Sequence, residues 1–335
     1  MEPKKHVAIS TDKLKSNRLP TGKGVLNKDT PDAVFDVGSL FIHDKQLFNF
    51  LDAFEKLHDY ILPIKSVFGC YGVKWMGGRN TNYQQMVPWN HQGWTPEVLI
   101  QEYNQRGIGC TYTFSNTLLT EKDLYDPSSN YLLDILASQN YSGNAVAVTQ
   151  DCLSDYIRKR YPDLKQKVSV CKSTKDMPHK RTFEYYESLC DKFELVYLHP
   201  DDNLNLKLLK EISDSGKAEK YIPLINERCT WNCQIRNNHY DETSKAQIEG
   251  WHGMFNFSNV DFIHTPSHPK TICPRILMPH LRTCVLSRSE FKRVYDFGFR
   301  RFKLQGRDSP WASMLYNFST YMLEQDYIAE KTFTY

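Results

Sequence analysis

Residues 95–116, TPEVLIQEYNQRGIGCTYTFSN, join a helix pattern directly to a strand pattern. Thr95 is a typical N-cap residue, Pro96 suits the first helical position, and Glu97 lies in the first turn. Gly107 then ends the helix, and the β-rich run IGCTYTFSN follows at once. The stretch therefore predicts one helix–strand unit of a parallel α/β fold, because crossover helices connect the strands of a parallel sheet.

The same alternation repeats on both sides of this stretch from Asp32 onward. The predicted strands, rich in β-branched and aromatic residues, are residues 62–72, 108–116, 143–151, 167–173, 194–200, 220–227, 283–287 and 300–306. Helical spacing lies between most of them and again in residues 309–328. No glycine-rich turn typical of dinucleotide-binding sheets occurs near the start. We therefore expect a (β/α)8 TIM-type barrel.

The predicted barrel forms a single domain, residues 32–335, with a closing C-terminal helix and an irregular cysteine-containing insertion after strand 6. Residues 1–31 are rich in lysine and predict a basic, poorly ordered N-terminal tail. A composition of 40% hydrophobic and 24% charged residues is typical of a globular protein. The sequence lacks a membrane-spanning apolar run and a secretory signal, so we expect no membrane and a cytoplasmic location.

Polar residues end most of the predicted strands, and the strand ends of such a barrel gather at one rim, where its chemistry takes place. Glu227 or Asp151 would serve there as acid or base, and His199 as a proton-transfer group. The candidates for binding a substrate or an anion are Arg79, Asn116, Lys172, Arg228, Arg288 and Arg307. Any single polar strand end is more often a solvated rim residue than a catalyst, and the eight together are the stronger signal.

Four of the nine cysteines, Cys229, Cys233, Cys273 and Cys284, lie in the irregular region after strand 6. The C-x3-C spacing of the first two places their thiols close enough to hold one metal atom. Four thiolates suit either tetrahedral Zn²⁺ or a [4Fe–4S] cluster. The wide separation of the second pair is unlike a zinc ribbon and favours iron–sulfur, whereas nearby histidines keep a mixed Cys/His zinc site open. Thiols without a metal are the third alternative.

The phrases LINERCTWNCQIRNNHY (residues 224–240) and FGFRRFKLQGR (residues 297–307) resemble the peptidase U32-like group. This group of iron–sulfur barrels includes proteins that support hydroxylation of ubiquinone precursors and of tRNA or ribosomal RNA bases. The resemblance implies a barrel, a cluster held by the four cysteines, and a substrate pocket at the same rim. The cysteine spacing here differs from the spacings usual in the group.

The leading functional hypothesis is an iron–sulfur barrel enzyme that modifies a small molecule or a nucleic-acid base by redox chemistry such as hydroxylation. One alternative is a base-exchange enzyme similar to tRNA-guanine transglycosylases, in which zinc braces a loop. The other is a non-catalytic barrel that binds a protein partner or nucleic acid, for which the formal net charge of +3 is permissive. The sequence leaves the oligomeric state open.

Overall fold

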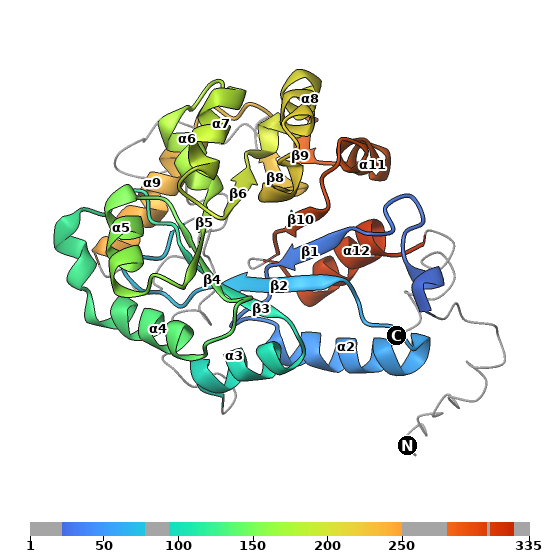
Figure 1. Ribbon diagram of the computed structural model, residues 1–335, viewed down its shortest axis with the longest axis horizontal. Coiled ribbons are helices and arrows are strands. Elements are labelled where there is room, and N and C mark those ends of the chain that lie inside the picture. Colours follow the sequence, from blue (N-terminus) through green and yellow to red (C-terminus); the bar gives the residue numbers. More distant parts are fainter. Residues whose placement is uncertain (1–21, 78–93, 250–279, 307–308, 325–335) are drawn as a thin grey trace, which may run out of the picture.

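Eight parallel strands form one sheet at the centre of the protein (Figure 1), in a computed structural model that describes residues 22–77, 94–249, 280–306 and 309–324. In spatial order the strands are β10 (Arg301–Leu304), β1 (Val34–Val37), β2 (Ile64–Gly69), β3 (Gly109–Phe114), β4 (Ala145–Val148), β5 (Lys165–Val168), β6 (Leu195–Leu198) and β7 (Tyr221–Pro223). A parallel bridge between Leu224 and Lys303 links β7 to β10. The sheet is therefore a nearly closed barrel, which confirms the predicted fold.

Helices surround the strands (Figure 1). They are α2 (Asp44–His58), α3 (Pro96–Gln105), α4 (Pro127–Ser138), α5 (Asp151–Arg160), α6 (Val170–Asp176), α7 (Phe183–Cys190), α8 (Leu206–Asp214), α9 (Arg236–Ile248), α11 (Arg288–Asp296) and α12 (Trp311–Met322). Short 3-10 helices are η1 (Gly22–Val25), η3 (Glu121–Tyr125), η4 (Pro200–Asp202) and η5 (Ala218–Lys220). Thr95 caps α3 as predicted, with its side chain accepting a hydrogen bond from the amide of Val98.

Two hydrophobic clusters hold this arrangement together. The larger one includes side chains of the strands and of the surrounding helices, for example Leu99, Tyr103 and Val146. The smaller one includes Tyr197, Leu224 and Tyr240. Burial of these apolar side chains is the main favourable contribution to folding.

Three predicted elements differ in the structure. The first barrel strand is β1, which the sequence did not reveal, so the predicted first strand is β2. Residues 283–287 do not form a barrel strand, because β9 (Thr283–Val285) pairs antiparallel with β8 (Asn226–Thr230) in a separate two-stranded sheet. Residues 167–173 are not one strand, because β5 ends at Val168 and Ser169 caps α6.

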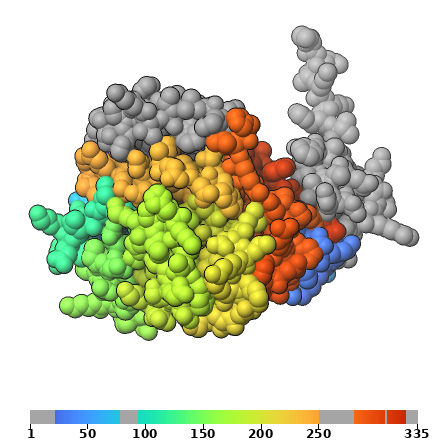
Figure 2. Space-filling view, turned by 90° about the horizontal axis from the view of Figure 1, so that it is seen from above, coloured from blue at the N-terminus to red at the C-terminus, as the bar shows by residue number. Residues whose placement is uncertain are grey.

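The insertion lies after β7, which is the predicted sixth strand, and it is more regular than expected. Its described part contains the β8–β9 pair and the thirteen-residue helix α9. Helix α9 packs against α6, and an ion pair of 3.1 Å joins Asp241 to Lys175 on that helix. Figure 2 shows the residues of α9, in light orange, lying against the green and yellow part of the chain. The insertion is thereby fixed to one side of the barrel.

The last residues of the predicted tail also pack in the described structure. Val25 and Leu26 are buried, and Leu26 forms an antiparallel bridge with Leu323 after α12. Arg288 adds hydrogen bonds to Asn27 Oδ1 and to the Leu323 carbonyl oxygen. Among the described helices, none combines the length and the hydrophobicity needed to span a bilayer.

Candidate functional site

A cavity of about 60 Å³ lies at the carboxyl ends of the barrel strands. Its wall comes mostly from strands β2, β3, β4 and β10 and from the segments just beyond β3, β5, β7 and β10. Strand β8 and helix α9 supply the rest. The lining residues are Phe68, Thr113, Ser115, Ala147, Ser169, Val170, Cys171, Leu224, Glu227, Tyr240, Lys303, Gln305 and Gly306. This is the rim at which (β/α)8 barrels place their chemistry.

Glu227 connects this cavity to the cysteine-containing insertion. Its Oε1 atom accepts a hydrogen bond of 2.8 Å from the backbone amide of Cys229, and Gln305 Nε2 lies 3.4 Å away. Asn226 fixes the backbone of Gln305. Its side-chain oxygen accepts a hydrogen bond of 2.7 Å from the N–H of Gln305, and its side-chain nitrogen donates one of 2.9 Å to the carbonyl oxygen of Gln305. The predicted carboxylate therefore lies in the cavity wall, held by Gln305 just beyond β10 and by the amide of Cys229.

Lys303 supplies a positive charge to the cavity. Only 8% of the residue is exposed, and its Nζ atom lies 3.7 Å from the ring centre of Tyr197 and 4.2 Å from that of Phe68. Ammonium groups are attracted to aromatic faces at such distances. The two rings therefore hold the ammonium group of Lys303 in place at the wall of the cavity.

A buried ionic network crosses the barrel interior. Asp36 on β1 receives hydrogen bonds of 2.9 Å from Lys167 Nζ on β5 and from Arg301 Nε on β10, and one of 3.0 Å from the Tyr197 hydroxyl. Because β1 and β5 are not neighbours in the sheet, the contact with Lys167 spans the interior. Burial alone would raise the pKa of Asp36, but Arg301 and Lys167 hold it well below its usual range. Burial lowers the pKa of Lys167 to about 8.

The thiols of Cys229 and Cys233 form a hydrogen-bonded pair in the insertion. This hydrogen bond, followed by burial, raises the pKa of Cys233. Asn232 adopts a left-handed backbone conformation, with φ of 52°, just before Cys233. Asparagine tolerates that conformation better than most residues. The tight turn after β8 brings the second thiol back to the first.

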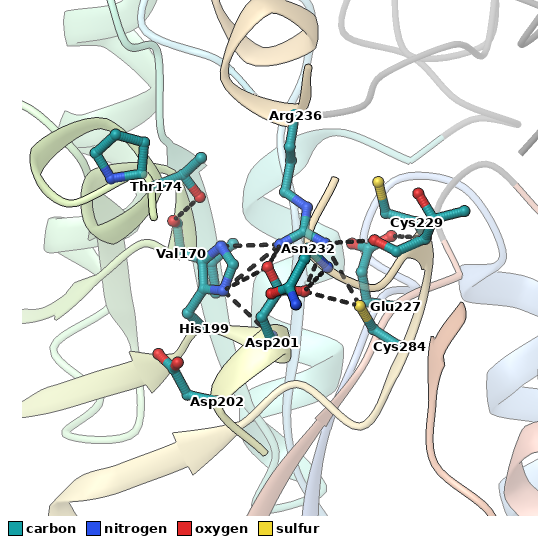
Figure 3. Close-up of polar contacts among 12 residues, drawn as sticks. Val170, Thr174, His199, Asp201, Asp202, Glu227, Cys229, Asn232, Arg236 and Cys284 are labelled. Carbon is teal, nitrogen blue, oxygen red and sulfur yellow. Dashed lines mark hydrogen bonds and ion pairs between the residues drawn. The ribbon is translucent and has the colours of Figure 1, made fainter. Parts of the chain in front are cut away.

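The guanidinium group of Arg236 organises the other side of the insertion. Figure 3 shows His199, Asp201 and Cys284 converging on it. Arg236 forms two hydrogen bonds to Asp201, of 2.8 and 2.9 Å, and its Nη1 atom lies 2.9 Å from His199 Nε2. The Cys284 thiol donates to Asp201 at 3.1 Å and lies 3.4 Å from Arg236 Nη2. These bonds join β9 to the end of β6.

The chemistry of the thiols fits part of a sulfur-ligated centre. Cys229 and Cys233 are paired, and the charge of Cys229 raises the pKa of Arg236 against the effect of burial. Arg236 Nε is buried without a hydrogen-bond partner in the described part of the chain. A nearby cationic group with an unused hydrogen-bond donor stabilises thiolates and an anionic cluster. Within the described ranges no group of three or more His, Cys, Asp or Glu side chains is placed to hold a metal.

Of the predicted site residues, Glu227 lines the cavity, and Cys229, Cys233 and Cys284 do not. Cys229 contacts Glu227 through its backbone amide, Cys284 lies opposite Glu227 in the β8–β9 pair, and Cys233 is bonded to Cys229. His199 is buried in the network of Arg236, and burial, followed by the charges of Arg181 and Arg236, holds its pKa well below the usual value. It does not line the cavity.

The other predicted site residues in the described part of the chain form contacts elsewhere in the fold. Lys172 pairs with Asp151 at 3.1 Å and with Asp176 at 3.3 Å. The amide of Asn116 donates to the carbonyl oxygens of Lys74 and Ser244 and so anchors α9. Arg288 binds the terminal segments, and Arg228 is half-buried on β8 without lining the cavity. Arg79, Arg307 and Cys273 lie outside the described residues.

Lys303 and Tyr240 are two of the lining residues that the sequence analysis did not predict. In the run RFKL the lysine sits between apolar neighbours, and alternation in a strand puts Arg301 and Lys303 on one face. Two basic residues on the inner face of a buried strand were a signal that could have been found. Tyr240 gave no such signal, because it comes from a helix in the region that seemed irregular.

Comparisons with known proteins support the fold. No protein-family model matches this sequence, and no curated protein matches it. The chain is similar to a solved structure of a U32 peptidase, Mk0906, with a TM-score of 0.51 and 15% sequence identity, over 82% of this chain and 92% of that one. The resemblance to U32 peptidases predicted from two short phrases is therefore confirmed as a likeness of the whole barrel.

Proposed function

We propose that this chain is a (β/α)8 enzyme that modifies a small molecule or a nucleic-acid base by redox chemistry at the mouth of its barrel. Cys229 and Cys233 would hold a [4Fe–4S] cluster together with Cys284 and with Cys273, which lies outside the described residues. When bound, such a cluster would supply electron transfer.

The observation that carries the proposal is the position of Glu227. Strand β8 puts this carboxylate in the cavity wall and Cys229 two residues further along, and a hydrogen bond of 2.8 Å joins the two. A substrate in the cavity would therefore lie against Glu227, whose carboxylate contacts the backbone of Cys229. Glu227 is held by the amide of Cys229 and by Gln305, so it is positioned to accept or hold a proton of the substrate.

Metal analysis of anaerobically purified protein tests the proposal. We expect about four iron and four sulfide ions per chain and a brown colour. Cys233→Ala should lose most of the iron, because it removes one of the two paired thiols. Cys152→Ala is the matched control, since this half-buried cysteine of α5 does not line the cavity and should leave the iron content unchanged.

Two results would contradict the proposal. One is wild-type protein that contains zinc or no metal, which would remove the redox part of the proposed function. The other is Cys233→Ala protein with the iron content of the wild type, which would show that any iron binds elsewhere.

A further inference from the structure

We propose that the cavity at the barrel mouth binds an oxyanion of the substrate, a carboxylate or a phosphate group, against the ammonium group of Lys303. This inference rests on the proposed function, since it concerns the same cavity, and it names the class of substrate. Lys303 would hold the anionic end of the substrate and so orient the rest of it at Glu227.

Lys303 has a fixed position at the cavity. The residue lies at the third position of β10, and the rings of Phe68 and Tyr197 confine its Nζ atom. Both Phe68 and Lys303 line the cavity. A side chain held in this way loses little further freedom when a ligand binds, which favours binding by a preorganised charge.

The charges of the cavity lining favour the same ligand. Among the residues that line the cavity, Lys303 is the cationic one and Glu227 the acidic one. Only 8% of Lys303 is exposed, so little water screens its charge. Opposite charges attract more strongly where water is excluded, so an oxyanion in the cavity would be attracted to Lys303 more strongly than to an exposed lysine.

Residues that carry hydroxyl groups line the same cavity. They are Thr113, Ser115 and Tyr240. Hydroxyl groups around a fixed cation are typical partners for the oxygens of a carboxylate or phosphate. The cavity, of about 60 Å³, has room for such a group.

Calorimetric titration of the full-length protein with inorganic phosphate and, separately, with malonate tests this inference. We expect the wild type to bind at least one probe and Lys303→Met to bind it roughly 10- to 100-fold more weakly, because a charge-assisted hydrogen bond is lost. Lys65→Met is the matched control, since Lys65 is exposed on the neighbouring part of the barrel, on β2. It should bind the probe as the wild type does.

The two probes separate the two kinds of oxyanion. Binding of phosphate alone indicates a phosphorylated substrate, and binding of malonate alone indicates a carboxylic acid. Absence of binding of both probes to the wild type would overturn the inference, as would equal affinity in Lys303→Met.

A second measurement keeps the inference testable if Lys303→Met does not fold. Wild-type protein is treated with acetic anhydride with and without the bound probe, and acetylation is measured by mass spectrometry of peptides. The probe should slow acetylation of Lys303 several-fold and leave that of Lys65 unchanged; no protection of Lys303 would overturn the inference. Metal content is measured in the same samples, so protein without metal that still binds the anion would contradict only the proposed cluster.

Discussion

Removal of the carboxylate of Asp36 should destabilise the protein strongly. This side chain is fully buried and accepts hydrogen bonds from Lys167, Arg301 and Tyr197. Asp36→Asn keeps its size but leaves two cations in the barrel interior without a counter-charge. Breaking a buried ion pair in this way costs about 3–5 kcal/mol. We expect a decrease of that size in the free energy of unfolding, measured by urea denaturation followed by circular dichroism.

The exposed ion pair of Lys210 and Asp214, with a distance of 2.8 Å, provides the control. Asp214→Asn should change the free energy of unfolding by no more than about 0.5 kcal/mol, because solvent screens exposed pairs. Adding Lys167→Met to Asp36→Asn should recover part of the loss, since it removes one stranded cation. If Asp36→Asn lowered the free energy of unfolding by less than about 1 kcal/mol, this ionic network would not stabilise the barrel as described.

Two further predictions concern Asp44 on α2 and Gly69 on β2. Burial raises the pKa of Asp44 from 3.8 to about 7, so the folded state keeps this proton longer than the unfolded chain. The free energy of unfolding should therefore fall as the pH rises from about 4 to about 7, and denaturation of Asp44→Asn across this range should show a smaller fall. A Cβ atom at Gly69 would collide with the backbone oxygen of Leu40, whereas one at Gly24 would meet nothing within 4 Å. Gly69→Ala should lower the melting temperature by several degrees and Gly24→Ala should not, and equal melting temperatures would contradict the packing described for β2.

Elements whose signals are local could be predicted from the sequence. The cap of α3 depends on Thr95 and Pro96 alone, and both act within one helical turn. The alternation of apolar runs and amphipathic helices was sufficient to predict a barrel, which the structure confirms.

Features that depend on distant partners could not be predicted. Strand β1 was missed because Asp36 interrupts its short apolar run, and the cations that make its burial possible lie on β5 and β10. Residues 283–287 have the composition of a strand, but composition does not tell which strand is its partner, and here that partner is β8.

In the candidate site, too, local signals could be predicted and distant contacts could not. Glu227 was recognisable as a polar residue at the end of a strand pattern, and it lines the cavity. Arg236 was recognisable as a positive charge near the cysteines, but its contacts were not, because its partners Asp201 and Cys284 lie 35 and 48 residues away in the sequence. Lys303 was hidden by its apolar neighbours in β10.

The most direct test of the central claim is a crystal structure of the anaerobically purified protein with anomalous scattering measured at the iron and zinc absorption edges. We predict iron peaks within bonding distance of the sulfur atoms of Cys229 and Cys233, in the insertion that also carries Glu227. Density that shows these two thiols without a metal, or with zinc in place of iron, would contradict it.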